Sequence, residues 1–186
     1  VWLAWLGNWN YPYSLPTGDW RGEMSIPREL SLTTVGGKRT LVQKPVPELD
    51  ALRGRATDLA GLKATDTVTA LGTGRTVEID LTLDVSHASE AWLGLARGTV
   101  DGKTQEVRVG VDISAGTLYL DRTDGGLMQV DGKDEGTTTD FALRRQTQYR
   151  PTGSTVRLHL YLDRSSLEVF VDDGTTGGID EDSGRL

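Results

Sequence analysis

The sequence predicts an all-β protein in which an antiparallel meander is followed by a two-sheet β-sandwich. Three observations predict this fold. Apolar and polar residues alternate with a period of two in several segments after residue 63, as in strands that bury one face. The 186 residues include 23 glycines and many threonines, which favour turns and strands over helices. The first 49 residues carry short apolar segments separated by turns that contain Pro and Gly.

Residues 1–49 are predicted to form the meander. Its candidate strands are three apolar segments at 1–7, 23–30 and 40–46. Such spacing suits one blade of a β-propeller. The only plausible helical spacing follows at 48–62. We therefore predict a linker over residues 50–62 that contains a turn of helix.

Residues 63–186 are predicted to form the sandwich. Strict alternation covers 77–85, 107–113, 156–163 and 167–171, and shorter candidate strands lie at 92–98 and 117–121. Several such strands separated by turn residues are typical of two packed sheets. A tight hairpin turn is expected at 163–166.

The C-terminal tail from residue 172 is rich in Gly and acidic residues and shows no alternation. We expect it to be loose. Without a partner strand from this tail, the strand at 167–171 would have an exposed edge. Whether the sandwich is truncated at this end is left open.

Composition and charge exclude several function classes. The formal net charge is −7, and an acidic surface repels phosphate backbones, so no nucleic-acid partner is expected. The absence of Cys removes disulfides, thiol nucleophiles and zinc–thiolate sites. No apolar stretch approaches the ~20 residues that span a bilayer, so no membrane partner is expected. No cofactor or metal is indicated. The apolar start lacks an initiator Met, which predicts a piece of a longer protein.

Aromatic residues are concentrated at the N-terminus. The chain has five Trp, five Tyr and two Phe, and half of these rings fall within the first twenty residues. Trp2 and Trp5 lie in an apolar run and are predicted to be core residues. Trp9 and Trp20 flank loop segments, and loops carry binding residues more often than strands do. Because flat rings stack on the C–H faces of sugars while polar neighbours bind hydroxyls, the loop is a candidate sugar-binding pocket.

Two long motifs in the same order resemble glycoside hydrolase family 32, which holds levanases, inulinases and invertases. The first is WLGNWNYPYSLPTGDWRGEMSIPRELSL followed by LVQKPVPEL, and it is similar to the family's last propeller blade. The second is LHLYLDRSSLEVFVDDG, which is similar to the family's C-terminal sandwich. The resemblance covers nearly the whole chain up to about Gly174. It implies a five-bladed propeller joined to a sandwich, acting on β-fructosides with retention, in a secreted enzyme.

The resemblance carries over a set of sugar-facing residues from the last blade: Trp9, Asn8, Tyr11, Trp20 and Arg21. Residues 27–30 are interpreted as structural, with Arg28 and Glu29 pairing across the blade. The sandwich motif contributes polar residues that we interpret as turn and interdomain contacts, namely Asp163, Arg164, Ser165 and Glu168.

The family's catalytic motifs are not found in the sequence. The family places its nucleophile in Trp-Met-Asn-Asp-Pro-Asn-Gly, a second Asp in Arg-Asp-Pro, and its acid/base Glu before a Cys, and none of these occurs here. Retaining hydrolysis needs two neighbouring carboxylates. We therefore expect no catalytic residues in this chain and no activity from it alone. The expected partners are a fructan or sucrose-type carbohydrate and the missing N-terminal propeller blades.

Two other function classes stay open. The chain could be a non-catalytic fructan-binding module that uses the outward faces of the sandwich strands, with Tyr161 and Phe170 as candidate contacts. It could also be a structural sandwich whose aromatic cluster is a patch awaiting a protein partner.

Other motifs are weak. His159 alternates outward in a strand and is predicted to lie at the surface, and neither it nor His87 is accompanied by a Gly-x-Ser-x-Gly motif. GTGR at 72–75 lacks the Lys-Ser/Thr of a phosphate loop. The acidic run DGKDEG at 131–136 lacks the frame of an EF-hand, so a solvated loop is preferred to a calcium site.

Overall fold

The structure, a computed structural model, describes residues 1–11 and 13–175, and its strands confirm the all-β prediction. In chain order the strands are β1 (Arg28–Val35), β2 (Lys38–Pro45), β3 (Val77–Asp84), β4 (Glu90–Val100), β5 (Lys103–Asp112), β6 (Thr117–Asp121), β7 (Gln129–Asp131), β8 (Thr138–Asp140), β9 (Arg144–Gln148), β10 (Thr155–Leu162) and β11 (Leu167–Val171). Two short 3₁₀ helices complete the fold, η1 (Pro47–Leu52) and η2 (Asp172–Gly174).

The N-terminal part is the predicted meander. β1 and β2 pair antiparallel along their full length. Their turn is made by Gly36 and Gly37 at φ of +55° and +80°, the left-handed region that a residue without Cβ adopts freely. The first segment runs antiparallel to the chain that leads into β1, through bridges from Trp2 to Arg28 and from Trp5 to Met24.

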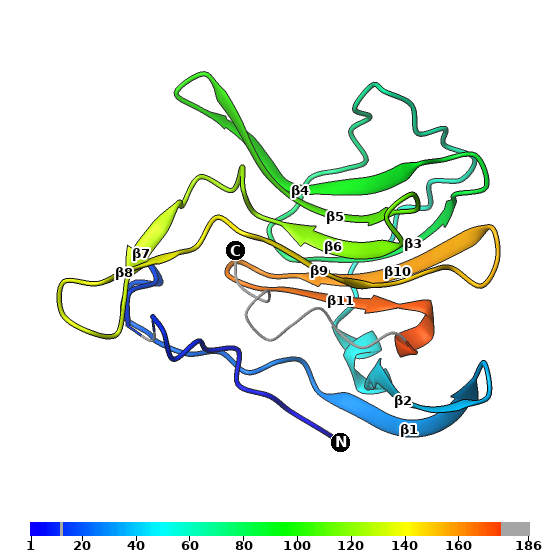
Figure 1. Ribbon diagram of the computed structural model, residues 1–186, viewed down its shortest axis with the longest axis horizontal. Helices are drawn as coiled ribbons and strands as arrows, with labels where there is room; N and C mark the ends of the chain where they lie inside the picture. Colours follow the sequence, from blue (N-terminus) through cyan, green and yellow to red (C-terminus); the bar gives the residue numbers. More distant parts are fainter. Residues whose placement is uncertain (12, 176–186) are drawn as a thin grey trace.

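The sandwich consists of a three-stranded sheet, β11-β10-β3, and a four-stranded sheet, β4-β5-β6-β9, all antiparallel (Figure 1). Alternation along β10 produces its core: Val156, Leu158 and Leu160 have no exposed surface, while the residues between them face outward. These side chains meet Val109 and Leu118 of the facing sheet in one apolar cluster.

The hairpin turn predicted near the C-terminal end of the sandwich is present. The Asp163 N–H donates to the Ser166 carbonyl at 2.9 Å, which closes the hairpin predicted at 163–166. Within the described part of the chain β11 pairs only with β10 and lies at the edge of its sheet. The tail expected to be loose begins at residue 172, and its first residues are ordered, since Asp172–Gly174 form η2 and Gly174 is buried. Residues 176–186 of the tail lie outside the described residues.

The predicted turn of helix forms only at the start of the linker, as a 3₁₀ helix. Only η1 forms, beginning with Pro47 at its first turn, and residues 53–76 contain no strand or helix and are exposed. The apolar residues of this run, such as Leu59 and Leu62, stay about half exposed, so a helix there would have no face to bury. No helix in the described residues is long and apolar enough to cross a bilayer.

A small ribbon links the sandwich to the N-terminal loop. β7 and β8 project from the four-stranded sheet toward the first residues of the chain (Figure 1). Tyr11 and Leu15 pack there with Val130 and Phe141 in a second buried cluster, and the Lys133 N–H donates to the Asn10 carbonyl at 2.8 Å. The aromatic loop is therefore anchored at both ends by packed structure.

Candidate functional site

The candidate site is the aromatic loop, which we define as residues 8–22. Its ends are held together because Leu6 N–H donates to the Glu23 carbonyl at 2.8 Å and Ser25 N–H donates to the Ala4 carbonyl at 2.7 Å. The buried Ser25 hydroxyl also accepts from the Ala4 N–H at 2.9 Å. The loop thus leaves and re-enters the blade at adjacent points.

Arg21 organises the loop from within. Its guanidinium donates to three carbonyls, those of Tyr13 at 3.1 Å, Gly18 at 2.6 Å and Trp20 at 2.7 Å. The Thr17 hydroxyl donates to the Trp20 carbonyl at 2.6 Å. The predicted binding residue Arg21 therefore sets the position of Trp20, and its donors are largely used inside the loop.

Trp9 and Trp20 are presented to solvent, with 70% and 43% of their surfaces exposed. Trp5 lies beneath Trp9, with ring centroids 5.1 Å apart at an angle of 61°. The Trp5 ring fits against two glycines, since a Cβ on Gly7 would lie 2.1 Å from its Cζ2 and one on Gly22 would lie 2.7 Å from its Nε1. Trp5 supports the exposed ring of Trp9 in this arrangement.

The prediction that Trp2 and Trp5 are core residues is wrong. Both keep more than a third of their surface exposed, 39% and 38%. The first segment pairs on one side only, through isolated bridges, and no second layer in the described residues covers the other side. An apolar run predicts burial only where such a layer exists.

The remaining predicted residues lie deeper. Tyr11 is buried, and its ring stands edge-on to Phe141 with centroids 5.7 Å apart. Asn8 is half-buried, and its Oδ1 accepts from the Asn10 N–H at 2.8 Å. The structure therefore joins Trp20 with Arg21 and Trp9 with Trp5, while Tyr11 anchors the loop to the sandwich.

Tyr13 is a further exposed ring of the same loop that the predicted binding residues do not include, and 73% of its surface is exposed. The available signal was its membership of the aromatic cluster. Two indole rings, a phenol ring and nearby polar groups can bind an uncharged ring with hydroxyls by stacking and hydrogen bonding. Among the described residues no group of three or more His, Asp or Glu side chains is arranged to hold a metal ion.

The loop and its blade are braced by the sandwich at β11. The Glu168 carboxylate accepts from the Ile26 N–H and from Arg28 Nη2, each at 2.7 Å. The Ser165 hydroxyl donates to Glu23 Oε1 at 2.6 Å. These contacts confirm that Glu168 and Ser165 are interdomain residues. Arg28 pairs across the hairpin with Gln43 at 2.9 Å, but its acidic partner is Glu168.

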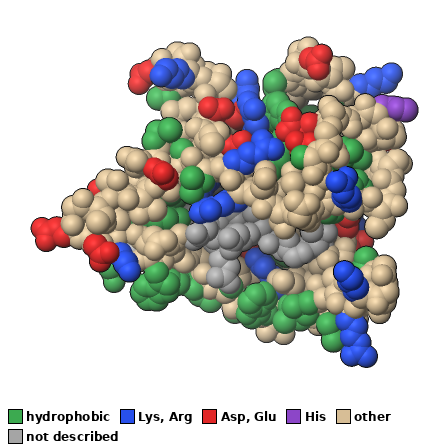
Figure 2. Space-filling model, in the orientation of Figure 1, with side chains coloured by type: hydrophobic (Ala, Val, Ile, Leu, Met, Phe, Trp, Pro, Cys, Tyr) green, Lys and Arg blue, Asp and Glu red, His purple; other side chains and the backbone are tan. Residues whose placement is uncertain are grey.

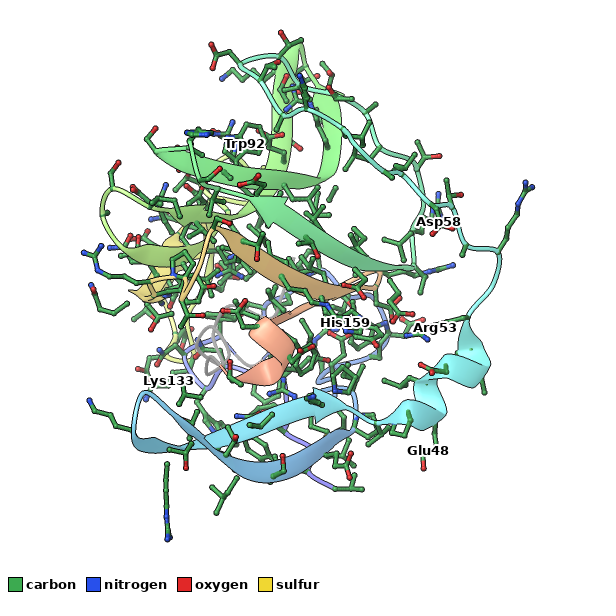
Figure 3. The ribbon with its side chains drawn as sticks, turned by 90° about the vertical axis from the view of Figure 1, so that its right-hand side faces the viewer. Glu48, Arg53, Asp58, Trp92, Lys133 and His159 are labelled. Atoms are coloured by element: carbon green, nitrogen blue, oxygen red, sulfur yellow. The ribbon has the colours of Figure 1, made fainter. Side chains whose placement is uncertain are left out.

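The outer face of the three-stranded sheet is largely covered, which weighs against a polymer-binding role for it. Phe170 is 6% exposed, and η1 lies over this face with Arg53 directed toward His159 (Figure 3). The hollow left between them is about 160 Å³, well below the ~300 Å³ of typical ligand pockets. His159, expected at the surface, is half-buried, with Nε2 2.7 Å from Glu78 Oε1.

Glu78 is the centre of the polar cluster under η1. Both of its oxygens accept from Arg53 at 2.6 Å, and Tyr161 Oη donates to it at 3.0 Å. The hydrogen bond from Arg53, together with those from His159 and Tyr161, lowers the pKa of Glu78 from 4.5 to about 2 despite partial desolvation. The charged carboxylate therefore holds the linker to the sheet.

We predict that this cluster gives the protein part of its acid sensitivity. Because the folded pKa of Glu78 is lowered, its stabilisation is fully present above about pH 4.5 and is lost as the pH falls toward 2. Compared with the unmodified protein, Glu78→Gln should have a lower free energy of unfolding at neutral pH. Its free energy of unfolding should also change less between about pH 4.5 and pH 2. Urea unfolding midpoints measured across this range check the slope, with Glu29→Gln on exposed β1 as the control. Equal slopes in Glu78→Gln and the unmodified protein would contradict the prediction.

A larger hollow, of about 570 Å³, lies elsewhere. Its lining includes the apolar Val107 and Leu162 together with Arg75 and Arg164. None of its lining residues belongs to the aromatic loop. It is therefore a feature separate from the candidate site.

Comparisons with known proteins show the family to which the chain belongs. Residues 1–45 match the family model described as Glycosyl hydrolases family 32 N-terminal domain, and residues 48–177 match Glycosyl hydrolases family 32 C terminal. The chain is 34% identical over 178 residues to a levanase of Bacillus subtilis (strain 168), which covers 94% of this chain and 25% of that protein. It is 31% identical over 183 residues to an extracellular exo-inulinase of Aspergillus awamori, covering 95% and 32%.

A solved structure is also similar. The crystal structure of exo-inulinase from Aspergillus awamori has a TM-score of 0.70 and 31% identity, over 98% of this chain and 36% of that chain. The chain thus spans between a quarter and about a third of the lengths of these relatives.

Proposed function

Because the chain belongs to glycoside hydrolase family 32, we propose that it is the C-terminal part of a hydrolase that cleaves fructans or other β-fructosides. In this proposal the aromatic loop forms part of the wall that holds a fructosyl unit, and the sandwich braces the blade that carries the loop. The catalytic carboxylates would come from propeller blades outside this chain.

The observation that carries the proposal is the pair of exposed indole rings on a loop whose frame is fixed. Trp9 is 70% exposed above Trp5, and Trp20 is set by the hydrogen bonds of Arg21. A ring that is already fixed in place loses little conformational entropy when a sugar stacks on it. The same loop lies in the part of the chain that matches the family's N-terminal domain model.

In retaining hydrolysis the residues that carry out the chemical steps can lie in a different chain segment from those that position the sugar. One carboxylate attacks the anomeric carbon and a second, ~5 Å away, protonates the leaving oxygen and then activates water. Under the proposal, Trp9 and Trp20 contribute orientation and exclusion of water around the sugar. Asn8, half-buried at the base of the loop, supplies an amide, and Tyr11 holds the loop against Phe141.

The proposed partner of the chain is the remainder of the propeller. Large apolar side chains gather on the first segment and the β1–β2 hairpin, along the lower edge of the view in Figure 2. Leu32 is 70% exposed and Met24 is 58% exposed, and Leu30 and Leu41 accompany them. Exposed apolar patches of this kind mark interaction surfaces, so neighbouring blades are the proposed cover. Secretion is proposed as well, since the similar inulinase is described as extracellular.

The proposal predicts that the purified chain releases no fructose or glucose from levan, inulin or sucrose, whereas it retains weak binding of fructose. Reducing-sugar assays test the first part, and calorimetry with fructose tests the second. Trp9→Ala should weaken binding about tenfold, as expected for loss of one stacking ring. The matched control is Leu32→Ala, whose side chain is equally exposed on β1. Measurable turnover by the unmodified chain, or binding that is unchanged in Trp9→Ala, would refute the proposal.

A further inference from the structure

The outer face of the four-stranded sheet carries Trp92, the one tryptophan of the chain outside the first twenty residues. Its neighbours in sequence, Leu93 and Leu95, point into the core, so Trp92 points away from it. It is 37% exposed. Figure 3 places it far from the β1–β2 hairpin, on the other side of the molecule.

Two glycines form a floor on which aromatic rings lie. Gly110 stands directly between Trp92 on β4 and Tyr119 on β6, and a Cβ there would lie 2.5 Å from Tyr119 Oη and 2.8 Å from the Ala91 carbonyl oxygen. A Cβ on Gly94 would lie 3.2 Å from Trp92 Cζ3. Both rings therefore need these positions to lack a side chain. The Tyr119 ring is buried, with 1% of its surface exposed, so Trp92 is the ring of this pair that solvent reaches.

Charged groups of both signs surround this floor. The buried carboxylate of Glu106 accepts from Arg97 and from Arg108, the latter with Nη2 2.5 Å from Oε1. Arg108 also lies 4.5 Å from the centroid of the Trp92 ring. These contacts fix the indole from one side and leave N–H donors at its rim.

The second group of charges is centred on Arg144, which stacks 3.6 Å from the centroid of the Tyr119 ring. Its guanidinium is 3.9 Å from Glu90 and 3.6 Å from Asp121. The face therefore has three guanidiniums, of Arg97, Arg108 and Arg144, and four carboxylates, of Glu106, Glu90, Asp121 and Asp112, the last of which lies opposite Glu90 in the sheet. Their formal charges sum to −1.

We propose that this face, which we name the Trp92 platform, is a second carbohydrate-binding surface that takes a neutral polysaccharide chain. A face without net positive charge gives a polyanion no net attraction, whereas paired guanidinium and carboxylate groups can donate to and accept from hydroxyls. The indole supplies the apolar area on which a sugar ring stacks. The platform lies on the sandwich, so the inference does not depend on sugar contact by the aromatic loop.

Affinity gel electrophoresis with the full 186-residue chain tests the proposal. Levan, inulin and soluble amylose are the neutral probes, and heparin is the anionic probe. At least one neutral polymer should retard the chain while heparin does not, and Trp92→Ala should weaken that retardation about tenfold. Absence of retardation by all three neutral polymers, or retardation by heparin alone, overturns the proposal.

Trp2→Ala is the matched control, because Trp2 is 39% exposed and has the Arg28 guanidinium 5.8 Å from its ring. Trp2→Ala should be retarded as strongly as the unmodified chain. If Trp2→Ala and Trp92→Ala lose retardation equally, the proposal is overturned. Circular dichroism establishes that each variant is folded. If Trp92→Ala is unfolded, Trp92→Phe decides, since a smaller ring on the same floor should bind about threefold more weakly. Unchanged retardation in Trp92→Phe then overturns the assignment.

Discussion

Replacing Glu168 by alanine is expected to lower the free energy of unfolding by about 3–5 kcal/mol, because it leaves a partly buried cation without its partner. The Glu168 side chain is 7% exposed and that of Arg28 is 17% exposed. The same change removes the acceptor of the Ile26 N–H. Arg28 would remain between the rings of Trp2 and Phe170, at 5.8 Å and 5.2 Å, with no carboxylate to balance it.

Chemical unfolding of Glu168→Ala, Arg28→Ala and the double variant checks this expectation. Arg28→Ala combined with Glu168→Ala should cost less than the sum of the two single changes, since the double variant leaves no unpaired charge. The control is Asp80→Ala, which breaks an exposed pair with Arg157 and should cost at most about 1 kcal/mol. A cost for Glu168→Ala no larger than that of the control would contradict a bracing role for this ion pair.

The sequence predicted the sandwich strands because alternation directly reflects burial of one face. β3, β5, β10 and β11 all lie within the runs that alternate at 77–85, 107–113, 156–163 and 167–171, apart from the first residues of β5 and β10. The order of strands in the sheets had no such local signal. The irregularity between Leu95 and Gly98, where Ala96 adopts a φ of +49°, was also unpredicted, because a bulge depends on the partner strand as much as on its own residues.

The candidate site was predictable as a region but not residue by residue. The density of aromatic rings identified the loop, whereas the depth of each ring depends on contacts distant in the sequence. Tyr11 is buried because Phe141 of the sandwich reaches it. Trp5 stays exposed although its apolar surroundings predicted burial. The Trp92 platform likewise depends on Gly110 and Tyr119 from other strands, so an isolated Trp gave no signal.

The joint between blade and sandwich has a second component at Gly174, where two backbones come into close contact. Gly174 has a φ of +80° and is buried, and a Cβ there would lie 1.9 Å from the Gln43 carbonyl oxygen on β2. Backbone atoms cannot move aside as the end of a side chain can. Gly174, in η2 directly after β11, therefore adds a backbone contact to the side-chain contacts that Glu168 and Ser165 make with the blade.

Gly174→Ala is accordingly expected to destabilise the protein by about 2–4 kcal/mol, from about 1 kcal/mol for the left-handed backbone and about 1–3 kcal/mol for overpacking. Gly136→Ala is the matched control, since Gly136 has a φ of +74° with nothing within 4 Å of its Cβ position, and it should show the backbone cost alone. Urea unfolding measures both. Limited proteolysis should also cleave the exposed linker at 53–76 faster in Gly174→Ala, because a displaced β2 loosens the blade from the sandwich. Equal destabilisation by the two alanines would mean that the contact with Gln43 can relax at little cost, and the joint would then rest on the side-chain contacts of Glu168 and Ser165.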